Sequence, residues 1–219
     1  MFPLYDTIPS IRKPFVNIMI IIVNVIVFAY ELMISSMDWS GEVLEGFFRT
    51  FGFVPEKMFY AFPIVAMFTH MFVHGGWSHI IGNMWFLKIF GDNVEDAMGH
   101  FKFFIFYITG GLFALFFHVI FNPFSPYPLV GASGAISAVM GAYFVLFYYS
   151  RIVSLVFLIL PFIVEIPAFI YLPYWFIIQV LNGLLADVTG TGVAYWAHAG
   201  GFIYGVIVGM RVRKKRYWY

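Results

Sequence analysis

Four polar residues with the chemistry of acyl transfer stand out in a chain dominated by apolar side chains. Serine is a weak nucleophile until a neighbouring base accepts its proton, and Ser133 and His198 supply one of each. His79 and Asn83 are four residues apart, so they share one helix face and could donate hydrogen bonds to a developing oxyanion. Together these residues predict a serine–histidine acyl-transfer site.

The composition predicts where such a site must be built. Of 219 residues, 62% are hydrophobic, 22% are aromatic and only 11% are charged, far from the balance of soluble domains. This places the chain in the membrane class. The absence of cysteine excludes disulfides, thiolate metal sites and a cysteine nucleophile.

The apolar runs predict an all-α membrane protein, one domain over residues 1–219. The first run is as long as a span and lacks the small-residue cleavage site of a signal peptide, so it is expected to remain as a helix. A large amphipathic outer loop is expected over residues 35–62, and the segment with Pro161, Glu165 and Pro167 is expected to be a packed or interfacial loop. Six transmembrane helices are expected at about 15–34, 77–97, 101–121, 131–149, 168–185 and 195–210.

The basic residues set the predicted orientation through the positive-inside rule. Arg12, Lys13 and the basic tail 211–216 place both termini in the cytoplasm, which requires an even number of crossings. Six crossings also place Lys88, Lys102 and Arg151 inside. Splitting both long apolar runs would give eight crossings, which has the same parity.

This orientation brings the polar residues to one depth. The second, fourth and sixth helices all begin at the outer face, and His79, Ser133 and His198 lie in their first turns. Small residues at similar spacing could pack the fourth and sixth helices closely enough for a Ser133–His198 hydrogen bond. These residues are Gly134, Ser137 and Gly141 on one helix, and Gly201, Gly205 and Gly209 on the other. Asp187 is the only carboxylate assigned to this depth, so a dyad is expected rather than a triad.

Other catalytic groups fit the sequence less well. His70, His74 and His79 could suggest zinc, but the residue after His70 is Met71 rather than the glutamate of a zinc-protease helix. Lys88 lies nine residues beyond His79, about 13 Å along the helix at ~1.5 Å per residue, too far from Ser133 for a serine–lysine pair. No metal and no cofactor are expected. The acidic group Asp92, Glu95 and Asp96 is expected to anchor loops.

Four motifs, each beside the expected apolar run, give the chain a resemblance to the rhomboid family of intramembrane serine proteases. They are His74-Gly75-Gly76-Trp77-Ser78-His79-Ile80-Ile81-Gly82-Asn83-Met84, Phe90-Gly91-Asp92-Asn93-Val94-Glu95-Asp96, Gly131-Ala132-Ser133-Gly134-Ala135-Ile136 and Ala197-His198-Ala199-Gly200-Gly201. The resemblance extends over nearly the whole chain and implies a six-helix rhomboid-like bundle.

The resemblance also implies roles for individual residues. Ser133 would be the nucleophile, His198 the general base, and His79 and Asn83 the oxyanion hole with the Ser133 amide. Gly131, Gly134 and His74 would support the site. One departure is Ser137, which stands where several family members carry an aromatic residue that can stack on the histidine; His198 would then depend on other contacts for its orientation.

At the level of the whole protein, the resemblance implies cleavage of the transmembrane helices of other membrane proteins near the outer face, at small residues in helix-destabilised segments. The substrate would enter laterally, with the fifth helix as a candidate gate. The expected partners are single-span or multi-span membrane proteins and the lipid bilayer, with no nucleic acid, and the expected location is a prokaryotic plasma (inner) membrane. The alternatives are a catalytically inactive rhomboid-like chaperone or trafficking factor and, third, a transporter or channel.

Overall fold

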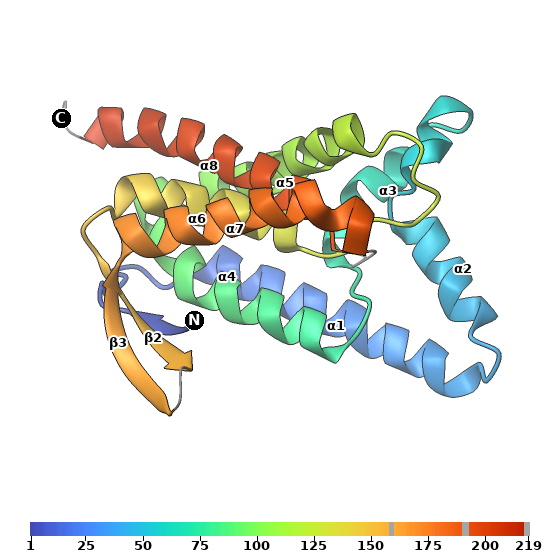
Figure 1. Ribbon diagram of the computed structural model, residues 1–219, viewed down its shortest axis with the longest axis horizontal. Helices are drawn as coiled ribbons and strands as arrows, with labels where there is room; N and C mark the ends of the chain where they lie inside the picture. Colours follow the sequence, from blue (N-terminus) through green and yellow to red (C-terminus); the bar gives the residue numbers. More distant parts are fainter. Residues whose placement is uncertain (158–159, 190–192, 217–219) are drawn as a thin grey trace.

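The computed structural model describes residues 1–157, 160–189 and 193–216, with the side chains of 186–189 and 215–216 left aside. Long helices lie roughly side by side along the longest axis of the molecule (Figure 1). They are α1 (Phe15–Met37), α4 (Trp77–Met98), α5 (His100–Phe121), α6 (Ser133–Leu146), α7 (Ala168–Thr189) and α8 (Tyr195–Arg216). Each expected span therefore corresponds to a helix, and α4 begins at Trp77, as expected.

The segment between α1 and α4 forms short elements at one end of the bundle. These are α2 (Glu42–Phe51), the 3₁₀ helix η1 (Pro55–Phe59), α3 (Ile64–Thr69) and the 3₁₀ helix η2 (His70–Phe72). The amphipathic character expected for this loop is present in α2, because Glu45 and Arg49 are exposed and paired while Phe47 and Phe51 pack against each other. An isolated antiparallel bridge between Phe53 and Leu129 ties this segment to the chain just before α6.

The opposite end carries a small sheet, so the expectation of an all-α fold is wrong in this part. Strands β1 (Phe2–Asp6), β2 (Arg151–Phe157) and β3 (Pro161–Pro167) form a three-stranded antiparallel sheet in the order β1-β2-β3. The segment expected to be an irregular loop is thus a hairpin. Its prolines stand at the two ends of the edge strand β3, where a missing backbone N–H costs least.

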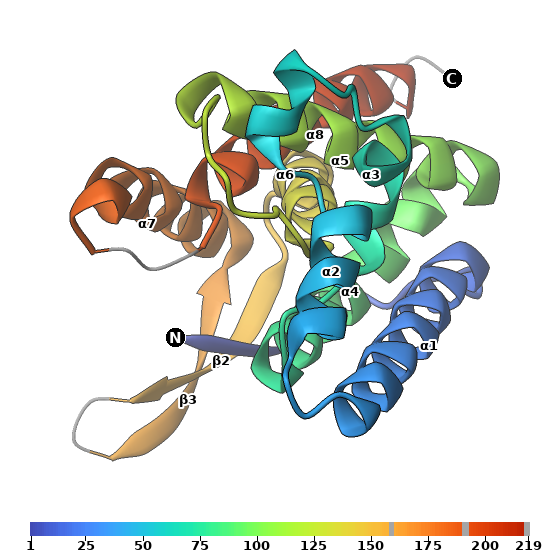
Figure 2. The ribbon, with the colours of Figure 1, turned by 90° about the vertical axis from the view of Figure 1, so that its right-hand side faces the viewer.

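Helix α6 lies at the centre of the bundle, surrounded by the other long helices when the molecule is viewed from the α2 end (Figure 2). Every residue from Gly134 to Tyr143 is buried. Its closest neighbour is α8: a Cβ at Gly201 would collide with the Gly134 carbonyl, and one at Gly205 with the Ala138 carbonyl. The predicted close packing of two small-residue stripes is confirmed, and it brings the two backbones into contact.

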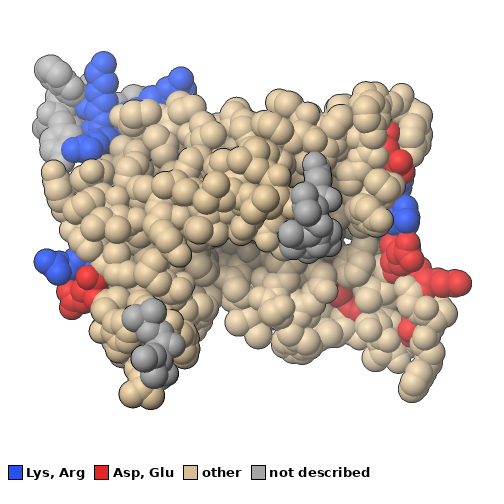
Figure 3. Space-filling view, in the orientation of Figure 1, with Lys and Arg blue, Asp and Glu red and all other residues tan. Residues whose placement is uncertain are grey.

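Three helices are long and apolar enough to cross a membrane by length and composition, namely Phe15–Met37, His100–Phe121 and the Ala168–Leu185 part of α7. Helix α6 is apolar but shorter. On the face in Figure 3, the acidic and basic side chains gather at the two ends of the molecule, with a band of other residues between them. That distribution matches a protein whose middle faces lipid and whose ends face water.

Candidate active site

Ser133 begins α6, directly after a backbone turn that only glycine adopts readily. Gly131 has a φ of 114°, in the region where a side chain would be strained, and its N–H donates to the His70 carbonyl at 2.8 Å. A Cβ at Gly131 would lie 2.5 Å from His79 Nε2 and 3.5 Å from Asn83 Nδ2. The glycine therefore lets the chain pass close to both side chains immediately before Ser133.

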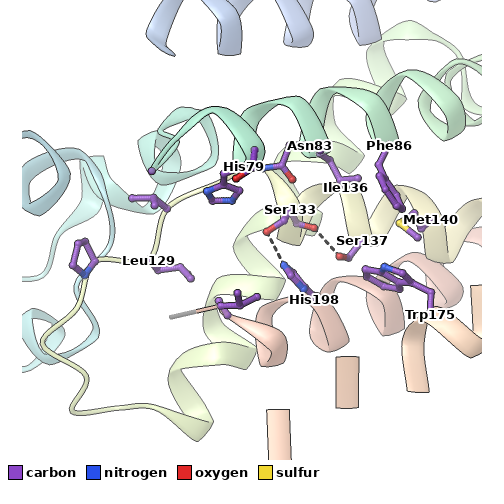
Figure 4. Close-up of a pocket in the computed structure, with 17 residues that line it drawn as sticks. His79, Asn83, Phe86, Leu129, Ser133, Ile136, Ser137, Met140, Trp175 and His198 are labelled. Carbon is purple, nitrogen blue, oxygen red and sulfur yellow. Dashed lines mark hydrogen bonds between the residues drawn. The ribbon is translucent and has the colours of Figure 1, made fainter. Parts of the chain in front are cut away.

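His198 lies in the first turn of α8 and points its ring toward Ser133. The Ser133 Oγ and His198 Nε2 are 2.8 Å apart, a normal hydrogen-bond distance. Figure 4 shows this contact, with His79 and Asn83 placed on the α4 side of Ser133. The hydrogen bond expected from the helix packing is present between the two residues singled out by the sequence.

The other ring nitrogen of His198 has a partner that the sequence reasoning missed. His198 Nδ1 lies 2.8 Å from Oε1 of Gln179, which is buried on α7. A signal was available, because an amide inside an apolar span is costly, and Gln179 is the only glutamine in the chain. The rings of Trp175 and Tyr195 also flank His198, with centroids 6.0 and 6.3 Å from the imidazole.

Ser137 makes a different contact from the aromatic residue whose place it takes. Its hydroxyl donates to the Ser133 carbonyl at 2.6 Å and thus stays within α6. In place of an aromatic residue on α6, His198 contacts Gln179 and Trp175 of α7 and Tyr195 of α8.

Asn83 offers a hydrogen-bond donor that has no acceptor. Its side chain is buried, and Nδ2 has no partner among the described residues. A buried donor without an acceptor is costly, so its presence beside a serine–histidine pair favours a ligand that brings an oxygen to it. The N-terminus of α6 adds a partial positive charge at the same place.

His74 connects the site to α1. Its ring lies edge-on to His79 with centroids 5.1 Å apart, and its backbone N–H donates to Glu31 Oε1 at 3.0 Å. Burial, followed by the nearby His79, lowers the pKa of His74 to about 4, so its ring is neutral near pH 7. The expectation that Asp187 was the only carboxylate at this depth is wrong, because buried Glu31 lies here; the Asp187 side chain is outside the described residues.

A cavity of about 580 Å³ lies beside the serine–histidine pair. Ser133, His198, His79 and Asn83 line its polar part, and an apolar part extends from them. The apolar part is lined by residues from α4, α6 and α7, which are Phe86, Ile136, Met140 and Trp175 (Figure 4). A cavity of this shape can hold a short apolar segment with one polar backbone group at the serine.

His70 and Gly134 complete the residues singled out by the sequence. His70 bonds the Ala66 carbonyl through Nδ1 and holds the Gly131 N–H through its own carbonyl, so it braces the turn before Ser133. Gly134 lies at one of the close contacts between α6 and α8, where a Cβ at Gly201 would meet its carbonyl, and a Cβ at Gly134 itself would meet Ala114 of α5. Within the described residues, no group of three or more metal-binding side chains is gathered.

Comparison with known proteins identifies the family. The rhomboid domain family model matches residues 62–215, which is more than half of the chain. The chain belongs to the rhomboid family. This family includes intramembrane serine proteases, and membership makes the chain an integral membrane protein with a helical bundle.

Three relatives illustrate the similarity. Rhomboid-related protein 2 of Mus musculus is 28% identical over 169 residues, covering 73% of this chain and 51% of the relative. Rhomboid-like protease 5 of Toxoplasma gondii is 28% identical over 151 residues, which are 64% of this chain and 15% of the relative. The chloroplastic rhomboid-like protein 11 of Arabidopsis thaliana is 34% identical over 91 residues, 41% of this chain and 32% of the relative. The matched regions thus span about half or less of these relatives.

Proposed function

We propose that this chain is an intramembrane serine endopeptidase that cleaves transmembrane segments of other membrane proteins. The observation that carries the proposal is the 2.8 Å hydrogen bond between Ser133 Oγ and His198 Nε2 at the wall of a cavity. An adjacent base is what a serine needs to become a nucleophile. Membership of a family that includes such proteases supports the same chemistry.

The proposed reaction gives each polar group that lines the cavity one role. Ser133 Oγ attacks the peptide carbonyl while His198 Nε2 takes its proton and later passes it to the leaving amine. Asn83 Nδ2 and His79 donate to the oxyanion, together with the backbone at the start of α6. Water then hydrolyses the acyl-enzyme by the same proton transfers in reverse.

The substrate class follows from the cavity and the bilayer. A peptide carbonyl in an intact helix is bonded to a backbone N–H, so a segment must unwind before its carbonyl can reach Ser133. Segments weakened by small or helix-breaking residues unwind at the lowest cost. Because α4 and α7 both line the cavity, we propose that the substrate enters between them, near the end of the bundle that carries α2.

The proposed topology is a single rhomboid-like domain with six crossings and both termini in the cytoplasm of a prokaryotic inner membrane. Its support is the arrangement of the helices: the N-terminal strand and the end of α8 lie at the sheet end of the bundle (Figure 1). The polar residues of the cavity stand at the opposite ends of α4, α6 and α8, in their first two turns. The catalytic cavity would then face the outer side of the membrane.

The test compares purified wild-type protein with Ser133→Ala on a single-span substrate in detergent or vesicles. Ser133→Ala should lose at least about 10⁴-fold in kcat, and a fluorophosphonate probe should label the wild type but not the variant. Ser36→Ala is the matched control, because that hydroxyl only bonds the Met33 carbonyl on the exposed side of α1. Equal cleavage by wild type and Ser133→Ala would refute the proposal, and an unlabelled, inactive wild type that still binds membrane clients would indicate the rhomboid-like chaperone instead.

A further inference from the structure

Gln179 is the single amide that α7 directs toward the serine–histidine pair. It is buried, and Trp175, four residues earlier on the same helix face, packs beside the same imidazole. Gly183, four residues later, leaves room for Trp196 of α8: a Cβ there would lie 3.2 Å from that ring. This face of α7 is thus fitted to α8, with Gln179 opposite His198.

The atom of Gln179 that faces the histidine determines which nitrogen carries the proton. Oε1 can only accept, so the 2.8 Å contact is satisfied as a hydrogen bond when His198 Nδ1 carries the proton of the neutral ring. Nε2 then keeps its lone pair toward the Ser133 hydroxyl, which is the arrangement a general base requires. In the opposite tautomer, Nε2 would carry a proton directed at Ser133 Oγ and could not accept the proton of the hydroxyl.

The neighbours of His198 cannot set the tautomer in the same way. Trp175 and Tyr195 contact the imidazole as rings, which restricts its tilt but does not distinguish the two nitrogens. The Ser137 hydroxyl is committed to the Ser133 carbonyl. Among the described residues, Gln179 supplies the acceptor recorded for Nδ1.

A neutral amide also fits its surroundings. A carboxylate in this position would be a buried charge within an apolar helix, with a large desolvation cost. The glutamine oxygen keeps the acceptor without the charge, and its bond to Nδ1–H strengthens when the imidazole becomes positive during the reaction.

We propose that Gln179 is a positioning residue that holds His198 in the Nδ1–H tautomer, with Nε2 free to accept the proton of Ser133. This proposal rests on the proposed peptidase function. Because Gln179 stands on α7 while the pair stands on α6 and α8, the base is correctly prepared only when α7 is packed against α8. The position of α7 is thereby linked to catalysis as well as to the cavity wall.

The experiment compares Gln179→Leu, which removes the acceptor at similar size, with Gln179→Glu, which keeps an oxygen acceptor in either protonation state. Gln179→Leu should lower kcat by about tenfold to a hundredfold with little change in KM, and Gln179→Glu should restore most of the activity. Ile177→Ala is the matched control, because this residue is exposed on the same helix and should leave kcat near the wild-type value.

A spectroscopic readout separates positioning from general structural support. ¹⁵N NMR of histidine-labelled protein, with the His198 signals assigned by their loss in His198→Ala, should show the Nδ1–H tautomer in wild type and Gln179→Glu. Gln179→Leu should shift the population toward Nε2–H while the melting temperature stays level or rises. An unchanged tautomer together with wild-type kcat in Gln179→Leu would overturn the proposal.

The two proposals can fail independently. If the wild type neither cleaves nor reacts with the fluorophosphonate, the peptidase assignment fails, and the tautomer measurement alone decides the role of Gln179. If the wild type cleaves and Gln179→Leu cleaves equally well, the peptidase assignment stands and the positioning role is refuted.

Discussion

The two ends of α4 carry polar side chains in two different states. Near its start, His79 and Asn83 border a cavity, and Asn83 has a buried donor without an acceptor. Near its end, Asn93, Glu95 and Asp96 belong to a bonded group, which we call the basal network, together with Asp6 and Tyr143. No buried polar atom of these five residues lacks a partner among the described residues.

The basal network fastens the N-terminal segment of the chain to α4. Glu95 accepts from the Val16 and Asn17 N–H groups at 2.9 and 2.7 Å. Both groups lie in the first turn of α1, where a backbone N–H has no acceptor within the helix. Asp96 accepts from the Ile11 and Arg12 N–H groups at 3.1 and 3.3 Å. Asp96 thus anchors the loop before α1, as expected, whereas Glu95 binds the first turn of α1 itself.

The difference indicates how structural and functional polar groups can be separated in a membrane protein. Both sets are polar residues on one helix, and both are costly to bury. In the basal network the cost is offset by bonds within the chain. At the cavity, Asn83 Nδ2 has no acceptor among the described residues, which is the pattern expected of a binding or catalytic site.

The largest effect on stability is expected from Glu95→Ala. It leaves two N–H groups of α1 without acceptors and should lower the free energy of unfolding by about 3 kcal/mol. The rate per folded molecule, counted by fluorophosphonate labelling, should stay close to wild type. Glu95→Gln keeps an acceptor, so its free energy of unfolding in denaturant titrations should lie between those of wild type and Glu95→Ala. A fall in kcat at unchanged stability would contradict the assignment of a structural role to this end of α4.

A matched pair of asparagines on the same helix sharpens the comparison. Asn83→Ala removes a donor that has no partner, so it should leave stability level or slightly higher while lowering kcat by about 10²–10³-fold.

Asn93→Ala should show the reverse pattern. Its amide donates to Asp6 Oδ2 at 2.7 Å and to the Ile8 carbonyl at 3.1 Å, so stability should fall by about 1–3 kcal/mol with kcat per folded molecule unchanged. Thermal unfolding and single-turnover cleavage of both variants measure the two quantities side by side. Equal losses of kcat in the two variants would remove the distinction.

Much of this arrangement could be predicted from sequence because it depends on local patterns. Apolar runs of span length predicted the long helices. The small-residue stripes, together with the acyl-transfer residues, predicted the contact of Ser133 with His198. The hairpin over 151–167 could not be read in this way, since its apolar strands resemble part of a span and its strand β2 pairs with the distant β1 at the start of the chain. The ends of some elements also differ from the prediction. Helix α6 ends at Leu146 rather than near 149, because residues 147–149 form a turn before β2.

Gln179 and Glu31 were missed for a different reason. Each is a polar residue flanked by apolar neighbours, with no recognisable motif around it, and its role depends on which side chain it contacts. The sequence contained the signal that such residues are costly, but only the packing of α7 on α8 and of α1 on the His74 segment supplied their partners.

The smallest effect is expected at the edge of the basal network, at Asp6. Burial is the main cause that raises the pKa of Asp6 to about 6, the nearby Asp92 adds to it, and the hydrogen bond from Tyr143 opposes it. Since this pKa is above the unfolded value of 3.8, the folded protein binds the proton more tightly. The contribution of Asp6 to stability is therefore fully present below about pH 4 and is lost as the pH rises through about 6.

The difference in the free energy of unfolding between wild type and Asp6→Asn should accordingly fall between pH 4 and pH 7, because the slopes caused by other groups are common to both proteins. Asp38 is the opposing control at the other end of the molecule, because hydrogen bonds from Ser40 and Val43 lower its pKa below 3.8. The contribution of Asp38 is present at neutral pH and is lost at more acidic pH, so the difference between wild type and Asp38→Asn should change with pH only below about pH 4, and in the opposite direction. If the free energy of unfolding of wild type minus that of Asp6→Asn is constant from pH 4 to pH 7, the basal network does not hold Asp6 in its protonated form. The hydrogen bonds from Tyr143 and Asn93 would then offset the cost of burying the carboxylate, a compensation that the Asn83 donor at the cavity lacks.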